Sequence, residues 1–446
     1  MKEEKEFFNF DLQGTDDQML ISLQRETFQY FLKETNPVTG LIVDKTQSGC
    51  PSSIAVVGMG ICTYIIGAED QLLSRQEAID RILKILHFFF NSEQSIAPDA
   101  TGYKGFYYHF LDMETGKRAW QSELSTIDTA FFVAGVLSAV AYFTCEDAKE
   151  KEIRTIGEQL YLRIDWEWAL NGGKTLTHGW KPESGFLRYR WNDNYSEALL
   201  LYILALGSPT YPINPEGYLR WTSTFTQKEM YSINYIYAGP LFIHQFSHLW
   251  IDFQGIADDF TRKAGFDYFE NSRRATLIHR QYAIENPLQY KHYGPFCWGI
   301  TASDGPGTKK AMIDGIQRKF YGYKARGAPF GPDDGTISPW AVVASLPFAP
   351  EIVLETTRHS IEKFNLKSHH QYGFDASFNP TYPDKKLNSF GWVSPWKFGL
   401  NQGPVIMMIS NHRSGLIWQL MKNCKYIKSG LKIAGFTGGW LEDTPL

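Results

Sequence analysis

Three carboxylates stand at the start of two strongly apolar segments. Glu123 and Asp128 lie in SELSTIDTAFF (122–132), and Glu197 opens EALLLYILALG (197–207). If both segments are buried helices that run in the same direction, the three side chains converge on one cleft. Mutual repulsion and partial burial raise a carboxyl pKa, which allows one group to stay protonated and donate to a leaving group, although a helix dipole acts in the opposite direction. The spacing therefore suggests acid–base chemistry.

The same acids have an alternative interpretation as helix caps. Asn194 precedes Glu197 by three residues, and Ser125 precedes Asp128 by three residues. This is the spacing of a capping box, in which two side chains satisfy free backbone N–H groups at a helix N-terminus. Both interpretations stay open from the sequence alone.

The elements that must position these acids are helices. Three segments, 53–68, 127–143 and 197–207, are apolar along their whole length. Each is shorter than the roughly 20 residues needed to span a bilayer. We therefore expect no membrane span, and we expect these helices to be surrounded by other helices.

Amphipathic segments alternate with the apolar ones. Together with the three apolar segments, these amphipathic segments and some shorter apolar ones near the C-terminus make about twelve expected helices. The nine further segments are 16–34, 74–93, 151–170, 241–253, 260–285, 338–348, 350–364, 403–410 and 414–423. Alternation of buried and amphipathic helices predicts an all-α fold, an (α/α)6 barrel formed by a double ring of helices in one domain over 1–446. Long loops at 94–121, 171–193, 286–337 and 365–402 would form a cleft at one end. A plain helical array is the alternative, but no fixed-period repeat is present.

Composition excludes several classes of function. Net charge is −4, which argues against a nucleic-acid partner, because phosphate binding needs a basic excess. The five cysteines are widely spaced and form no zinc or redox motif, so we expect them to be mostly reduced. The chain has no G-x-S-x-G elbow, P-loop or complete G-x-G-x-x-G motif. The N-terminal residues shown contain no apolar run typical of a signal peptide.

Metal sites are weakly indicated. His244 and His248 have i, i+4 spacing but lack the glutamate of a zinc-protease motif, so core histidines are the favoured interpretation. The loops TASDGPG (301–307) and GPDDGTISP (331–339) are typical of tight turns, with calcium ligation as the alternative.

Four blocks carry a resemblance to a known family. They are YGPFCWGITASDGPG (293–307), GAPFGPDDGTISPWAVVASLPFAPE (327–351), YGFDASFNP (372–380) and NQGPVIMMISNHRSGLIW (401–418). These blocks resemble the glucoamylase-like domain, with the signature concentrated in 215–430. Together with WNDNYSEALLLYILALGSP (191–209) and STIDTA (125–130), they make nearly the whole chain similar to glycoside hydrolase family 144.

The resemblance implies an inverting β-1,2-glucanase, acting internally or releasing sophorose from one end. It implies Glu197 as the catalytic acid and, less firmly, Asp375 as the base. Relatives are expected to carry an aspartate where this chain has Asn401, so Glu123 and Asp128 remain alternatives for the base or for sugar binding. Flat rings and polar side chains suited to sugar contacts are also expected: Glu123, Asp128, Arg188, Trp191, Tyr195, Trp298, Asp304, Asp334 and Trp396.

The same resemblance implies an oligo- or polysaccharide partner, hydrolysis without a metal or cofactor, and a periplasmic or cell-surface location. We also expect a monomer. Two alternatives to β-1,2-glucan hydrolysis stay open. One is hydrolysis of another glucan, as the glucoamylase-like label suggests. The other is a glycan-binding protein that has lost its catalytic activity.

Overall fold

The most apolar helices form the centre of the molecule. The computed structural model describes residues 14–366, 372–386 and 389–442. Helices α2 (Ile54–Glu69), α4 (Thr126–Tyr142) and α6 (Leu199–Gly207) are buried along almost their whole length. Helix α2 packs against α4 so closely that a Cβ atom added at Gly135 would lie 2.1 Å from the carbonyl oxygen of Gly58. Helices that are apolar all round require such partners on every side.

The central elements contact one another in succession. Helix α4 packs against α2 and α6, and α12 (Gly399–Arg413) packs against α2 and α10 (Pro339–Val343). Between α6 and α10 the chain forms two 3₁₀ turns, η3 (Leu241–His244) and η4 (Phe246–Leu249). The backbone N–H of Leu200 donates to Ser247 Oγ, and Gln245 Nε2 donates to the carbonyl of Ala341. These bonds connect η4 and its flank to α6 and α10.

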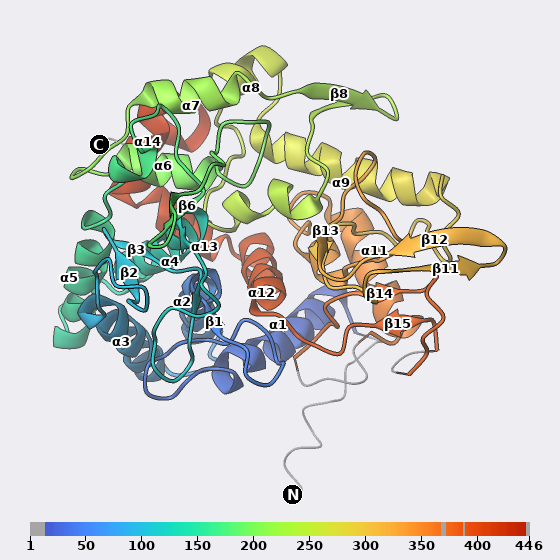
Figure 1. The fold of residues 1–446 in the computed structure, drawn as a ribbon, viewed down its shortest axis with the longest axis horizontal. Helices are drawn as coiled ribbons and strands as arrows, with labels where there is room; N and C mark the ends of the chain where they lie inside the picture. The colour runs from blue at the N-terminus through green and yellow to red at the C-terminus, as the bar shows by residue number, and fades with distance from the viewer. Residues whose placement is uncertain (1–13, 367–371, 387–388, 443–446) are drawn as a thin grey trace, which may run out of the picture.

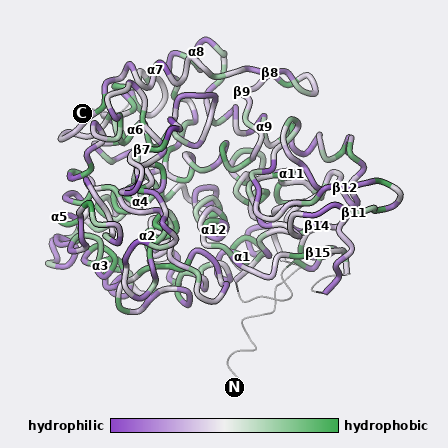
Figure 2. The backbone as a smooth tube through the Cα atoms, viewed as in Figure 1, coloured by the Kyte–Doolittle hydropathy of each residue, from purple (hydrophilic) through white to green (hydrophobic). Residues whose placement is uncertain are grey.

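Amphipathic helices cover this centre, each with one buried face. They are α1 (Asp16–Lys33), α3 (Arg75–Asn91), α5 (Ala148–Leu162), α9 (Tyr268–Glu285) and α11 (Pro350–Glu362). Figure 1 shows α3 and α5 at one edge of the molecule and α12 near its middle. In Figure 2 the central helix α2 carries mostly hydrophobic colours, whereas polar and apolar residues alternate along α3.

Several predicted boundaries were wrong. The helix expected over 241–253 consists of the two 3₁₀ turns, and the one expected over 260–285 is interrupted at Gly265, whose φ of 80° ends α8 (Asp259–Ala264). Helices α7 (Pro215–Thr222) and α14 (Lys425–Ile433) were not predicted, and the C-terminal region also contains α13 (Leu416–Lys422). The short 3₁₀ turns η2 (Trp168–Leu170) and η5 (Gly439–Leu441) complete the helical elements of the described residues.

Short antiparallel strands lie mostly within the segments predicted as long loops. The pairs are β1–β4, β2–β3, β8–β9, β10–β13, β11–β12 and β14–β15, and β5–β6–β7 form a three-stranded sheet. Their bounds are β1 Ser52–Ser53, β2 Gly102–Tyr103, β3 Phe106–Tyr107, β4 Phe110–Leu111, β5 Leu124–Ser125, β6 Gly179–Lys181, β7 Gly185–Phe186, β8 Gln227–Met230, β9 Ile233–Ile236, β10 Ala302–Ser303, β11 Lys309–Ile313, β12 Ile316–Phe320, β13 Lys324–Ala325, β14 Phe378–Asn379 and β15 Trp392–Val393. The fold is therefore helix-rich, with β-hairpins in its loops.

One hydrophobic cluster runs from Met19 to Leu441 and includes residues of all the central helices. Within the described residues, none of the helices has both the length and the apolar character that crossing a bilayer requires.

Candidate active site

The N-terminal ends of four central helices hold the candidate residues. At the start of α2 the N–H of Ile54 donates to the carbonyl of His109 (3.2 Å), and at the start of α12 the N–H of Gly399 donates to the carbonyl of Asp44 (2.8 Å). Ser125 is the N-cap of α4, and the backbone carbonyl of Glu197, just before α6, accepts from Ser247 Oγ (2.8 Å). The helix starts thus fix the backbone of each segment that carries a candidate residue.

Glu197 is not a helix cap. Helix α6 begins at Leu199, with Ala198 in the N-cap position and no side-chain cap, so the predicted capping box with Asn194 is wrong. Asn194 adopts a left-handed φ of 54° and donates through Nδ2 to Asp193 Oδ1. Because the chain turns before the helix starts, the Glu197 carboxyl is not used to satisfy the N-terminal N–H groups.

The electrostatic surroundings of Glu197 favour its protonated form. Its side chain is only partly exposed. Burial raises its pKa from 4.5 to about 7; a backbone hydrogen bond lowers the value by less, and the negative charge of Asp128 adds a smaller increase. A carboxyl that holds its proton near neutral pH can act as a general acid.

Asp128 combines the two roles that the sequence left open. Ser125 Oγ accepts from the Asp128 N–H (3.2 Å) and donates to Asp128 Oδ2, so the predicted cap at Ser125 is confirmed. The same Oδ2 lies 3.7 Å from His109 Nε2. The carboxylate therefore faces the other candidate groups while it supports the start of α4.

His109 lies between two of the predicted acids. Its Nδ1 is 3.1 Å from Glu123 Oε1, and its ring stacks on Phe110 at 3.9 Å. Burial alone would lower the His109 pKa, but Asp128 and Glu123 outweigh it and raise the value to about 9. For Glu123, burial acts to raise the pKa, and the bond to His109 lowers it overall. An imidazolium at this position neutralises part of the acidic cluster at neutral pH.

Asp44 is a further acid that the sequence analysis missed. It is buried, and burial raises its pKa to about 6, with His109 and Lys45 lowering it and Asp128 raising it. Asp128 therefore influences both Glu197 and Asp44. The available sequence signal was an aspartate directly after the buried run Leu41–Ile42–Val43.

Asp375 is held in a buried ion pair. Its side chain is 1% exposed, and its Oδ1 lies 3.0 Å from Lys397 Nζ, which also donates to the carbonyl of Gly373. Asn401 is buried in the first turn of α12. The Asp375 carboxylate is committed to the buried Lys397 ammonium, so its placement does not support the predicted role as base.

Three predicted sugar contacts belong to the core instead. Trp298 is 0% exposed and donates through Nε1 to Thr356 Oγ1. Asp334 is fully buried in a bidentate pair with Arg326, with distances of 2.7 and 2.9 Å. Tyr195 is buried and stacks on Tyr268. None of the three offers a surface to a ligand, and the sequence cannot distinguish such buried groups from loop residues that face a cleft.

The other predicted contacts are more accessible. Asp304 and Trp396 are partly exposed, and Asp304 accepts from Ser394 Oγ (3.1 Å). Arg188 is exposed and lies over the ring of Tyr189. Trp191 is mostly buried; it stacks on His178 at 3.9 Å and donates to Thr126 Oγ1 at the start of α4.

Tyr323 was not predicted, although it is an exposed aromatic residue in the bend between β12 and β13. It is 64% exposed, and its ring faces Phe398, which also contacts Lys45. The charges of Asp44 and Asp304 act on its hydroxyl. The residue therefore lies beside the acidic cluster and remains open to solvent.

The histidine pair is structural, as favoured from the sequence. His244 bonds Asn271 and the carbonyl of Ala238, and His248 bonds Ser272 Oγ at 3.0 Å. Burial lowers the pKa of His244 to about 4 and that of His248 to about 3. Across the described ranges, no group of three or more His, Cys, Asp or Glu side chains could hold a metal ion.

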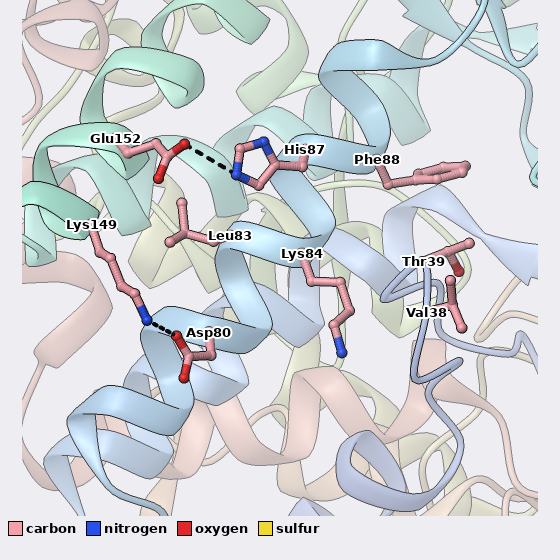
Figure 3. A pocket seen from close by; sticks show the side chains of 9 residues that line it. All are labelled: Val38, Thr39, Asp80, Leu83, Lys84, His87, Phe88, Lys149 and Glu152. Atoms are coloured by element: carbon pink, nitrogen blue, oxygen red, sulfur yellow. Dashed lines mark hydrogen bonds and ion pairs between the residues drawn. The ribbon is translucent and has the colours of Figure 1, made fainter.

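A separate surface hollow of about 660 Å³ lies over α3 and α5 (Figure 3). Both of its carboxylates are in ion pairs, Glu152 with His87 (3.2 Å) and Asp80 with Lys149 (2.7 Å). Because both carboxylates are held in ion pairs, this hollow lacks a carboxyl with a raised pKa like that of Glu197. The cluster around Glu197 is therefore the candidate active site.

Comparison with known proteins identifies the family of this chain. The family model described as "Putative glucoamylase" matches residues 188–425. A crystal structure from Bacteroides uniformis ATCC 8492 with the same description is 31% identical over 96% of this chain and 99% of its own, with a TM-score of 0.85. An endo-β-1,2-glucanase from Chitinophaga pinensis, in complex with sophorotriose and glucose, is 28% identical over 96% and 100%, with a TM-score of 0.83.

A characterised relative is longer. The exo β-1,2-glucooligosaccharide sophorohydrolase of Parabacteroides distasonis is 29% identical over 94% of this chain. The chain spans 58% of the length of that relative. The match over more than half of the chain and the similarity to the Bacteroides uniformis structure show that this protein belongs to the glucoamylase-like family.

Proposed function

We propose that this protein is a glycoside hydrolase that cleaves β-1,2-glucan with inversion of configuration, giving sophorose or short β-1,2-glucooligosaccharides. The observation that carries the proposal is the partly buried Glu197 carboxyl directly before α6, whose pKa burial raises to about 7. It is supported by the similarity to an endo-β-1,2-glucanase along almost the whole chain and to a sophorohydrolase.

In the proposed mechanism, Glu197 donates its proton to the glycosidic oxygen while a carboxylate activates water on the opposite face of the sugar. Inverting enzymes place these two groups roughly 6.5–9.5 Å apart. Asp44 replaces Asp375 as our proposed base, because its pKa of about 6 leaves it ionised near neutral pH. The charge of Asp128 raises the pKa of Glu197 and that of Asp44. Glu123 and Asp128 would bind sugar hydroxyls.

The fold that we propose is an (α/α)6 barrel over one domain. Helices α2, α4, α6, the η3–η4 turns, α10 and α12 would form its inner ring. The succession of contacts between these elements supports this arrangement. We further propose a monomer, and a location at the periplasm or cell surface on family resemblance alone.

A panel of linear glucans tests the function. We expect new reducing ends from β-1,2-glucan and none from α-1,4- or β-1,3-glucan. Cleavage of the α-1,4-glucan alone would indicate a glucoamylase-like specificity. Binding of β-1,2-glucan without product would indicate a glycan-binding protein and contradict the catalytic proposal.

A further inference from the structure

A short turn beside the acidic cluster contains extra residues. In its antiparallel pairing, Leu111 is opposite Arg118 and Tyr108 is opposite Leu124, so four residues on one strand face seven on the other. Hydrogen bonds hold both sides: Ala119 N–H to the carbonyl of Phe110, and His109 N–H to the carbonyl of Glu123, each 2.9 Å. The surplus around Trp120 must therefore bulge out of the ladder.

The bulge holds Trp120 in an unfavourable state. Trp120 and Gln121 have φ values of 54° and 49°, in the left-handed region that non-glycine residues rarely adopt. Arg118 fixes the bulge by donating through Nε to the carbonyl of Ser122 (2.6 Å). The Trp120 side chain is nevertheless 62% exposed, so the strained backbone does not serve to bury its ring. Strained backbone of this kind clusters at active sites and ligand-binding positions.

A chain of ring contacts connects Trp120 to the candidate active site. The Trp120 ring lies 5.0 Å from Phe110, and Phe110 stacks on His109 at 3.9 Å. His109 in turn lies 3.1 Å from Glu123 Oε1. An exposed indole is thus held two rings away from the acidic cluster.

We propose that Trp120 is a binding platform for a glucose ring of the β-1,2-glucan chain, outside the units joined by the scissile bond. The indole face would cover the apolar C–H face of the pyranose, and the exposed Gln121 amide would bond its hydroxyls. The inference rests on the proposed function and adds a determinant of chain-length preference to it.

The test compares Trp120→Ala with Tyr211→Ala, an exposed aromatic residue beyond the C-terminal end of α6. For Trp120→Ala we expect the KM for long β-1,2-glucan to rise roughly fivefold relative to the KM for the shortest cleaved oligosaccharide. Trp120→Phe should retain most of the preference, and Tyr211→Ala should leave the ratio unchanged.

Trp120→Gly separates binding from folding. Because glycine adopts a left-handed φ without strain, the Tm of Trp120→Gly should not fall below that of the wild type. The ratio of the KM for long β-1,2-glucan to that for the shortest cleaved oligosaccharide should change as it does for Trp120→Ala. An unchanged KM ratio in both variants, with β-1,2-glucan still cleaved, would overturn the platform alone. Failure of the wild type to cleave β-1,2-glucan would overturn the proposed function, and the assigned ligand with it.

Discussion

The pKa of Glu197 makes a prediction about stability that does not depend on activity. Glu197→Gln replaces an ionisable carboxyl by a neutral side chain of the same shape. A carboxyl whose pKa moves from 4.5 to about 7 on folding favours its protonated form by about 3 kcal/mol. Because the unfolded state ionises first, the wild type is stabilised below pH 4.5 and loses that contribution as the pH rises through 7.

Partial exposure of the side chain reduces the effect, so we expect Glu197→Gln to gain ~2 kcal/mol relative to wild type between pH 5 and pH 8.5. With an unfolding entropy of about 2.1 cal/mol/K per residue, this corresponds to a relative Tm increase of ~2 °C. Thermal unfolding at both pH values measures it, with Glu355→Gln on the exposed face of α11 as the control. An equal Tm difference at the two pH values would refute the argument that Glu197 is protonated by its surroundings.

Three further predictions follow from other residues. Asp375→Asn should lower the free energy of unfolding by about 3–5 kcal/mol by leaving Lys397 buried without its carboxylate partner, as denaturant titration would show; a loss of kcat in a fully stable protein would instead restore Asp375 as the base. His109→Gln should lose stability at pH 6 and lose less at pH 10, because the raised pKa of about 9 stabilises the fold below 6.5 and no longer does so above 9; Tm measured across this range decides it. Trp298→Ala should destabilise by about 3–5 kcal/mol with KM unchanged in the folded fraction, as expected for a core residue; a raised KM at full stability would return it to the sugar-binding set.

The strongly periodic and apolar helices could be predicted because their patterns extend over many residues. The expected segments 16–34, 53–68 and 127–143 differ from α1, α2 and α4 by one residue at each end or less. The short helices α7 and α14 span only eight and nine residues, too few for a clear period. Two-residue strands carry even less signal, so they were read as loops.

The site was predicted less completely, because side-chain roles depend on tertiary contacts. Glu197 and Asp128 were singled out by their position at the start of apolar segments, and their roles remain predictions. The capping spacing predicted one cap correctly and one wrongly. Asp44 and His109 reach the cluster from loops, and neither lies in a motif. Asp334 was predicted to be a loop acid that binds sugar, but it forms a buried ion pair with Arg326. The two residues are eight positions apart, and no sequence pattern indicates that they pair.

The most direct test of the account follows the first anomer released from linear β-1,2-glucan by proton NMR, for wild type and Glu197→Gln. The account predicts that the wild type first releases α-anomers, as inversion of a β-linkage requires, and that a folded Glu197→Gln variant has lost nearly all of this activity. First release of β-anomers would contradict inversion, and full activity of Glu197→Gln would contradict its role as the acid.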